Sequence, residues 1–355
     1  MTALHIAPLT RFDDPGTATA PAPPEARGLA RDGVRLLVAG RAGVTHARFS
    51  DLPSFLEPGD LVVVNNSATL AAELDGILVR SGPVVVHAAT ELDDGSWVVE
   101  LRTAPDARRA VLDASPGDQV SLRGLARLEL LEPHPATGSS PTGRGNRLWR
   151  ARATGPRSLR NHMLRHGRPI AYGYLDRRYP LADYQTVFGV VPGSAEMPSA
   201  GRPFTTELVT SLVAHGIGVV AVTLHTGVSS QEAGEAPQPE WFRVSPAAAR
   251  LVSSTRELGG RVVAVGTTVT RALESAVDGD GVVRPTQGWT DRVVSRAEPA
   301  RVVNGLVTGW HDPQASHLLL VEAVAGPELT QRAYDQARRA GYLWHEFGDS
   351  GLLLP

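Results

Sequence analysis

Two residue types are absent from the 355-residue sequence: cysteine and lysine. Without cysteine, the protein cannot form disulfides, thiolate nucleophiles, cysteine-ligated zinc sites or iron–sulfur clusters. Without lysine, it cannot provide the phosphate-binding lysine of a Walker motif or a Schiff-base lysine for pyridoxal phosphate. Several large enzyme classes are therefore excluded, and arginine carries the permanent positive charge of the side chains.

Long apolar runs, aromatic residues and an excess of positive charge are also lacking. No apolar run reaches the ~18 residues of a membrane span, and the N-terminus does not resemble a signal peptide, so we predict a cytoplasmic protein with no membrane partner. The formal net charge is −2, whereas nucleic-acid-binding proteins are typically basic. Residues 144–160 and 175–179 are locally basic, and a solvated face is the simpler interpretation of each.

The order of sequence patterns predicts a mixed α/β fold with an insertion. Residues 13–30, rich in proline and alanine, are typical of an extended lead-in that is not packed. Short β-rich runs separated by turn residues fill 73–158 and predict an all-β module. Strands alternate with helices from about residue 186. We therefore predict an α/β domain formed by residues 1–72 and 159–355, and an inserted β-barrel domain at 73–158.

Three predicted strands end in polar clusters, at 223–227, 266–268 and 308–311. If these strands are parallel, the three clusters meet at one edge of the sheet and frame a pocket, although each alone could be an ordinary turn. Gly266, Thr267 and Thr268 directly precede a predicted helix, whose first N–H groups can hold an anion, and Thr267 can also act as a simple cap. Arg271 and Glu274 follow on that helix, close enough to pair or to face a ligand.

Two histidines are candidates for proton transfer, because His225 and His311 lie at strand ends and imidazole titrates near neutral pH. A structural role is about as common for a single histidine. His162 and His166 have helical spacing but no evident third ligand, so we predict no metal site. The string 216–221 matches a dinucleotide-binding pattern by letters only, since it precedes a strand, and we reject it.

Six stretches carry recognisable motifs: 58–65, 183–188, 198–205, 223–227, 259–275 and 333–349 are similar to PGDLLVVN, DYQTVYA, PTAGLHFT, TLHVG, GGRVIAVGTTSVRTLES and a closing AYxxA…FGDA segment. In these motifs the chain resembles the S-adenosylmethionine:tRNA ribosyltransferase-isomerase family of queuosine synthesis. Their order and spacing hold over nearly the whole chain.

This resemblance implies a distorted α/β barrel-like domain with an inserted β-barrel, and we expect a monomer. It also implies a reaction in which S-adenosylmethionine donates its ribosyl group to the aminomethyl group of a 7-deazaguanine base in tRNA, and adenine and methionine leave. The implied catalytic residues are His225, His311 and Glu274. The implied residues that bind S-adenosylmethionine are Gly266, Thr267, Thr268, Arg271, Tyr184, Gln185, Thr205 and Asn65.

The sequence also departs from the family. Arg202-Pro203 replaces the histidine of AGLHFT, and two arginines that follow the PGDLLVVN strand are missing from 66–73. Two hypotheses therefore remain open. The first is a working ribosyltransferase-isomerase, and the second is a paralogue that uses another acceptor or only binds an adenosyl ligand. A third hypothesis is an RNA-binding scaffold without chemistry, which the 5% aromatic content does not favour.

Overall fold

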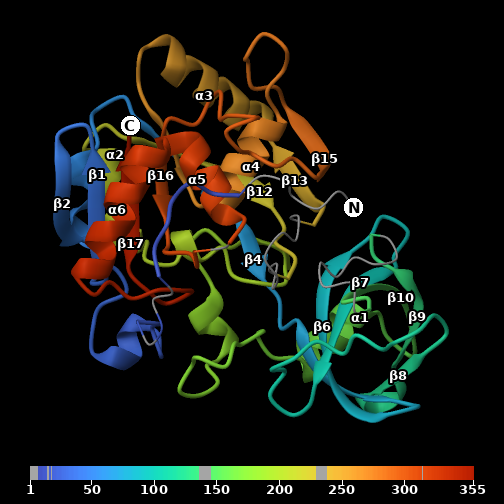
Figure 1. Ribbon diagram of the computed structural model, residues 1–355. Helices are drawn as coiled ribbons and strands as arrows, with labels where there is room; N and C mark the ends of the chain where they lie inside the picture. The colour runs from blue at the N-terminus through green and yellow to red at the C-terminus, as the bar shows by residue number, and fades with distance from the viewer. Residues whose placement is uncertain (1–6, 14–15, 17, 136–144, 229–237, 314) are drawn as a thin grey trace.

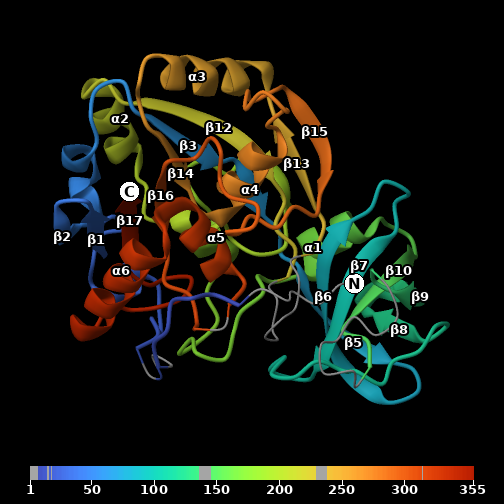
Figure 2. The same cartoon turned by 45° about the horizontal axis from the view of Figure 1, so that its top comes forward.

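The computed structural model describes residues 7–13, 16, 18–135, 145–228, 238–313 and 315–355. An α/β body and a smaller β-barrel lie side by side in both views (Figures 1 and 2). Within the described ranges, no helix is long and apolar enough to cross a membrane.

A nine-stranded mixed sheet forms the centre of the α/β body, in the order β15-β13-β12-β3-β14-β16-β17-β1-β2. The four strands β12, β3, β14 and β16 are parallel, whereas β16 and β17 are antiparallel. The strands are β1 (Arg35–Gly40), β2 (Gly43–Arg48), β3 (Leu61–Asn65), β12 (Gly218–Leu224), β13 (Glu240–Val244), β14 (Val262–Val265), β15 (Thr286–Thr290), β16 (Gly305–Thr308) and β17 (Ser350–Leu354).

Alternating side chains give this sheet two apolar faces, because successive residues of a strand point to opposite sides. Leu61 and Val63 of β3 pack in one core with residues of α3, α4, α5 and α6, whereas Val62 and Val64 pack in a second core with α2 and η2. The helices are α1 (Leu159–His166), α2 (Thr206–Ala214), α3 (Pro246–Glu257), α4 (Thr267–Ser275), α5 (His317–Ala325), α6 (Pro327–Arg339) and the 3-10 helices η1 (Pro24–Arg27), η2 (Phe49–Phe55), η3 (Arg123–Leu125), η4 (Leu181–Tyr184) and η5 (Ser199–Gly201).

The barrel is a closed antiparallel sheet in the order β10-β7-β6-β5-β8-β9, with its own apolar core. Its strands are β5 (Glu73–Leu78), β6 (Gly82–Glu91), β7 (Trp97–Thr103), β8 (Gln119–Leu122), β9 (Arg127–Pro133) and β10 (Leu148–Thr154). The barrel lies in sequence between α1 and the short strand β4 (Ser67–Thr69), which pairs with β11 (Val191–Ser194). The predicted α/β fold with an inserted β-barrel is therefore confirmed, and the exact domain limits stay a prediction.

A buried glutamate joins the barrel to the chain that follows it. Glu73, at the start of β5, is fully buried and accepts hydrogen bonds from Arg168 Nε at 2.6 Å and from His87 Nε2 at 3.1 Å. Arg178 lies 2.6 Å from the same carboxylate, and the backbone of Glu73 pairs with that of Arg168. Two arginines that follow the insertion thus hold its first strand.

The lead-in is packed where the structure describes it, contrary to the prediction for 13–30, of which residues 14, 15 and 17 lie outside the described residues. Ala20 and Ala22 are buried, and Ala20 donates a backbone hydrogen bond to Trp344 at 3.2 Å. Glu25 of η1 lies 2.8 Å from Arg202. The small alanine side chains let this segment lie against the body, so a composition typical of linkers here forms a packed element.

Candidate active site

A cavity of about 830 Å³ opens where β12, β14 and β16 end. Thr226 and Gly227 follow β12, Gly266–Thr268 follow β14, and Thr308–His311 end β16; all of them line the cavity. The three strands have the same direction in one sheet, so their carboxyl ends lie at one edge. The predicted meeting of the three polar clusters is confirmed.

Residues from outside the sheet complete the walls. Tyr172 and Tyr174 come from the segment after α1, and Glu196 follows β11. The barrel contributes Arg102 and Arg108, which makes the cavity a shared feature of both bodies.

Backbone strain also occurs in this lining. Ala107 and His345 have φ angles of 55° and 69°, and within the described ranges they are the non-glycine residues with positive φ. Both line the cavity. Left-handed conformations are costly for residues with a Cβ and gather at functional sites, so the packing here holds a shape that the backbone alone would not take.

One end of the cavity is suited to an anion. Gly266 is the N-cap of α4, with φ 90° and no side-chain cap, so the predicted capping by Thr267 is not observed. Arg271, one turn into α4, pairs with Glu240, and its Nε has no hydrogen-bond partner. The Nε of Arg292 is also buried without a partner, and both arginines line the cavity. Free donors and the positive end of a helix favour a carboxylate or phosphate here.

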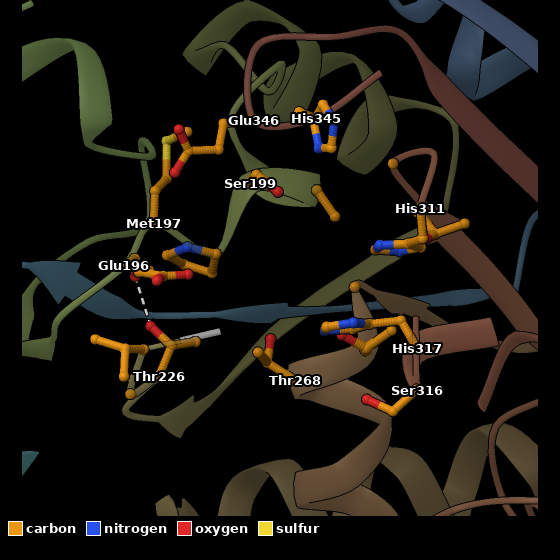
Figure 3. A pocket seen from close by; sticks show the side chains of 18 of the residues that line it. Glu196, Met197, Ser199, Thr226, Thr268, His311, Ser316, His317, His345 and Glu346 are labelled. Carbon is orange, nitrogen blue, oxygen red and sulfur yellow. Dashed lines mark hydrogen bonds between the residues drawn. The ribbon is translucent and has the colours of Figure 1, made fainter. Parts of the chain in front are cut away.

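Two histidines lie face to face on the same side of the cavity (Figure 3). The rings of His311 and His317 are 4.7 Å apart and nearly parallel, at 5°. His311 Nε2 lies 3.1 Å from Thr308 Oγ1. Burial lowers the pKa of His311 well below its usual value, and burial together with Arg271 lowers the pKa of His317 to about 4. Both rings are therefore neutral at pH 7, and burial makes each a weaker base than an exposed imidazole.

His225 does not line the cavity, although Thr226 and Gly227 do. Its Nδ1 lies 2.7 Å from Ser67 Oγ, and its ring stacks on Trp241 at 5.3 Å. A Cβ on Gly193 would lie 2.3 Å from this ring, so only glycine allows its position. Burial, with a smaller effect of Arg160, lowers the pKa of His225 to about 4.

Glu274 is also outside the cavity lining. Its carboxylate is fully buried and accepts backbone hydrogen bonds from Arg301, Val302 and Val303 at 2.9, 2.9 and 3.0 Å. Arg271 pairs with Glu240 instead. Of the two alternatives for Arg271 and Glu274, pairing with each other is therefore not observed, and only Arg271 lines the cavity. A helix side chain that binds three consecutive N–H groups fixes the loop before β16.

Four further predicted residues hold the frame behind the cavity lining. Asn65 bonds both the N–H and the C=O of Leu224, at 3.1 and 2.8 Å. Gln185 bonds the N–H and C=O of Thr69 at 3.0 and 2.8 Å. Thr205 caps α2, and the Tyr184 hydroxyl is buried without a partner. The structure thus brings Gly266, Thr267, Thr268, Arg271 and His311 together, and leaves the other predicted residues outside the lining.

Sequence reasoning missed much of the lining. Tyr172, Tyr174 and Glu196 lie in irregular segments, where hydrophobic periodicity gives no signal. His345 and Glu346 stand directly before the Phe-Gly-Asp of the closing segment, and that neighbourhood was the available signal. His317 begins α5, six residues beyond His311.

Arg202 occupies the region where the sequence departs from the resembled family. It is 1% exposed, donates to Asp183 O at 3.1 Å and pairs with Glu25 at 2.8 Å. Burial lowers the pKa of its guanidinium, although Glu25 opposes this effect. Its Nη2 is buried without a partner.

The histidine pair of α1 forms an aromatic contact, with ring centroids of His162 and His166 4.8 Å apart. Over the described ranges, no three histidine or carboxylate side chains group as metal ligands.

Comparisons with known proteins agree on one family. A family model described as queuosine biosynthesis protein matches residues 10–353. The S-adenosylmethionine:tRNA ribosyltransferase-isomerases of Symbiobacterium thermophilum and Nitrobacter winogradskyi are 35% and 33% identical over 91% and 92% of this chain, and 94% and 92% of their own lengths. A crystal structure of S-adenosylmethionine tRNA ribosyltransferase from Thermotoga maritima, 25% identical, aligns with a TM-score of 0.51 over 97% of this chain and 99% of its own. The chain belongs to the queuosine biosynthesis protein family.

Proposed function

We propose that this protein transfers and isomerises the ribosyl group of S-adenosylmethionine onto the 7-aminomethyl-7-deazaguanine base of tRNA, with release of adenine and methionine. The observation that carries this proposal is that Gly266–Thr268, from the resembled stretch 259–275, and the strand-end cluster Thr308–His311 line a single cavity. The family match over residues 10–353 supports the same reaction. A cytoplasmic monomer is part of the proposal.

The anion-suited end of the cavity is the proposed site for the methionine carboxylate of S-adenosylmethionine. The first N–H groups of α4 and the partially free guanidinium groups of Arg271 and Arg292 can donate to it together. Glu240 holds Arg271 in place, and Gly227 N donates to the other oxygen of Glu240 at 3.1 Å. The carboxylate end of the donor is thereby fixed while its ribose extends toward the histidine pair.

His311 is the proposed proton-handling residue, because a neutral imidazole on the cavity wall can take a proton from a carbon acidified by the sulfonium. Thr308 fixes the ring through its contact with Nε2. The ring of His225 does not line the cavity, so it is not proposed to handle a proton. Its proposed role is to orient the next residues, Thr226 and Gly227, which do line the cavity. Glu274 and the other predicted residues outside the lining act by holding the frame.

The test is to incubate the protein with S-adenosylmethionine, with and without tRNA that carries the aminomethyl base, and to follow adenine and methionine by mass spectrometry. Release of both products that depends on this tRNA is the expected result. Binding of the donor without release, or release only with another acceptor, would instead identify the paralogue. Tight binding of bulk tRNA with no effect of the donor would identify the RNA-binding scaffold.

A further inference from the structure

The cavity also has a wall of carboxylates and aromatic rings. Glu196, His345 and Glu346 line it (Figure 3). Tyr172 and Tyr174 belong to the same lining. Tyr174 stacks on His345 at 4.7 Å and 13°, and Tyr172 and Tyr174 stack at 6.0 Å. Carboxylates next to aromatic faces are the surroundings that an organic cation prefers.

Each carboxylate of this wall is held by a tyrosine. Tyr172 donates its hydroxyl to Glu196, and Tyr174 donates to Glu346 at 3.1 Å. Within the described chain, Glu346 forms no ion pair with an arginine or histidine. Burial and the nearby charge of Glu196 raise the pKa of Glu346 to about 8. Because burial disfavours the charged form of Glu346, a ligand that brings a cation to this side chain would stabilise its carboxylate.

An independent observation also indicates a ligand with polar groups in this cavity. The indole Nε1 of Trp310, a cavity residue that is 2% exposed, has no hydrogen-bond partner. The Nε of Arg271, which is 8% exposed, also lacks one. Buried donors are normally paired, so donors left over in a cavity lining are typical of a binding site.

We propose that Glu346, supported by Glu196, binds the primary ammonium of the acceptor base and accepts the proton that this amine must lose before it attacks the donor. This inference rests on the proposed function. In the step, an N–H bond of the ammonium breaks and an O–H bond forms on the Glu346 carboxylate. The electron pair stays on nitrogen, so ammonium and carboxylate become neutral amine and carboxylic acid, and the amine is then nucleophilic.

The geometry explains why two carboxylates are present. The groups that face Glu346 are Glu196, Tyr172, Tyr174, Tyr184 and His345. Glu196 makes Glu346 a stronger base than an ordinary carboxylate, which brings its proton affinity closer to that of an alkylamine. The two tyrosine hydroxyls orient the oxygens, and the stacked rings can flank the flat base that carries the amine.

The experiment compares two acceptors that differ by one charge: tRNA with the aminomethyl base, and the same tRNA with this amine acetylated. The wild type should bind the amine form about tenfold more tightly, because a hydrogen bond to a charged group contributes at least the free energy of a tenfold change in affinity. Glu346→Gln should bind both forms equally and lower single-turnover adenine release about 10²-fold. Its affinity for S-adenosylmethionine, from calorimetry, should stay within about twofold.

Three controls keep this test decisive. Glu207→Gln, an exposed carboxylate on α2, should behave as the wild type. If Glu346→Gln does not fold, Tyr174→Phe tests the same carboxylate, because it removes the hydroxyl that donates to Glu346. Glu196→Gln should move the acidic limb of the single-turnover pH profile to lower pH, since it removes the charge that makes Glu346 basic; a merely structural Glu196 would leave the limb in place.

Retained discrimination between the two tRNA forms in Glu346→Gln would overturn the inference. So would a tenfold loss of S-adenosylmethionine affinity with tRNA discrimination intact, because the carboxylate would then bind the amino group of the donor. A wild type that releases no adenine would contradict the proposed function separately, since discrimination between the two tRNA forms is measured without the donor.

Discussion

His311 and His317 lie on the cavity wall as stacked neutral rings, and His311 is the one held by Thr308. We expect His311→Ala to lower adenine release about 10²-fold or more, as is usual when an acid–base group is lost. His215→Ala, on the exposed end of α2, is the matched control and should leave the rate unchanged. Release by His311→Ala within about twofold of the wild type would exclude a proton-handling role.

Arg292 brings a buried guanidinium Nε without a partner to the anion-suited end. Arg292→Gln should weaken S-adenosylmethionine binding about tenfold, because a charge-assisted hydrogen bond to the carboxylate is lost. Calorimetry would measure this, with Arg339→Gln on the exposed end of α6 as the control. An unchanged dissociation constant would place the carboxylate elsewhere in the cavity.

The pKa of Glu346, raised to about 8 by burial and Glu196, makes stability depend on pH in a definite direction. A carboxyl group with a raised pKa in the folded state favours folding while it is protonated, and this contribution is lost as pH rises from about 4.5 through 8. Glu346→Gln, which stays neutral, should therefore gain about 1–3 kcal/mol relative to the wild type between pH 5 and pH 9, allowing for partial exposure. Urea denaturation at both pH values measures the difference. A difference in the free energy of unfolding that is the same at both pH values would contradict this prediction.

For single residues, the sequence patterns predict cavity residues that directly follow a strand. They do not predict cavity residues that lie in irregular segments. Gly266, Thr267, Thr268 and Arg271 were found because a strand pattern stops at a helix start. Tyr172 and Glu346 have no such marker, since their positions depend on chain segments that meet only in the folded protein. Asn65 was identified, but its amide binds backbone groups of β12, which composition alone does not reveal.

Among the elements, α4 is held at its far end by the carboxylate of Glu274, which receives three backbone N–H groups. Glu274→Gln replaces one acceptor by a donor in a fully buried site, so it should lower the free energy of unfolding by about 2–4 kcal/mol. Donor affinity should remain near that of the wild type at a temperature where the variant is folded. A large fall in turnover with unchanged stability would instead restore the predicted catalytic role.

Element existence was predicted well because the patterns were long. The alternation of strands and helices expected from about residue 186 is present, for example in β12 at Gly218–Leu224 and α3 at Pro246–Glu257. The lead-in was mistaken, because alanine and proline are typical both of linkers and of segments that pack tightly against a surface. Its burial depends on partners such as Trp344, more than 300 residues away in sequence.

For the whole molecule, Glu73 determines how the barrel is attached. Its fully buried carboxylate contacts Arg168, Arg178 and His87. Glu73→Gln removes the charge that these three groups share, although Arg168 keeps Asp75 and His87 keeps Glu100. Loss of one member of a buried charge pair costs about 3–5 kcal/mol. We expect a correspondingly lower denaturation midpoint, and weaker tRNA binding, because the barrel contributes Arg102 and Arg108 to the cavity. Asp75→Asn should have a much smaller effect, because Asp75 is exposed where it pairs with Arg168.

The position of β17 has a consequence for how the protein is made. β17 lies between β16 and β1 in the central sheet, and Leu36 pairs with Ser350 across more than 300 residues of chain. Until β17 has been synthesised, β1 therefore has its neighbour β2 but not β17, and one edge of each of β1 and β16 stays unpaired. Such edges attract other strands, so a product that stops before β17 has a divided sheet. Synthesis of this one strand thus closes two sheet edges that would otherwise be open to aggregation.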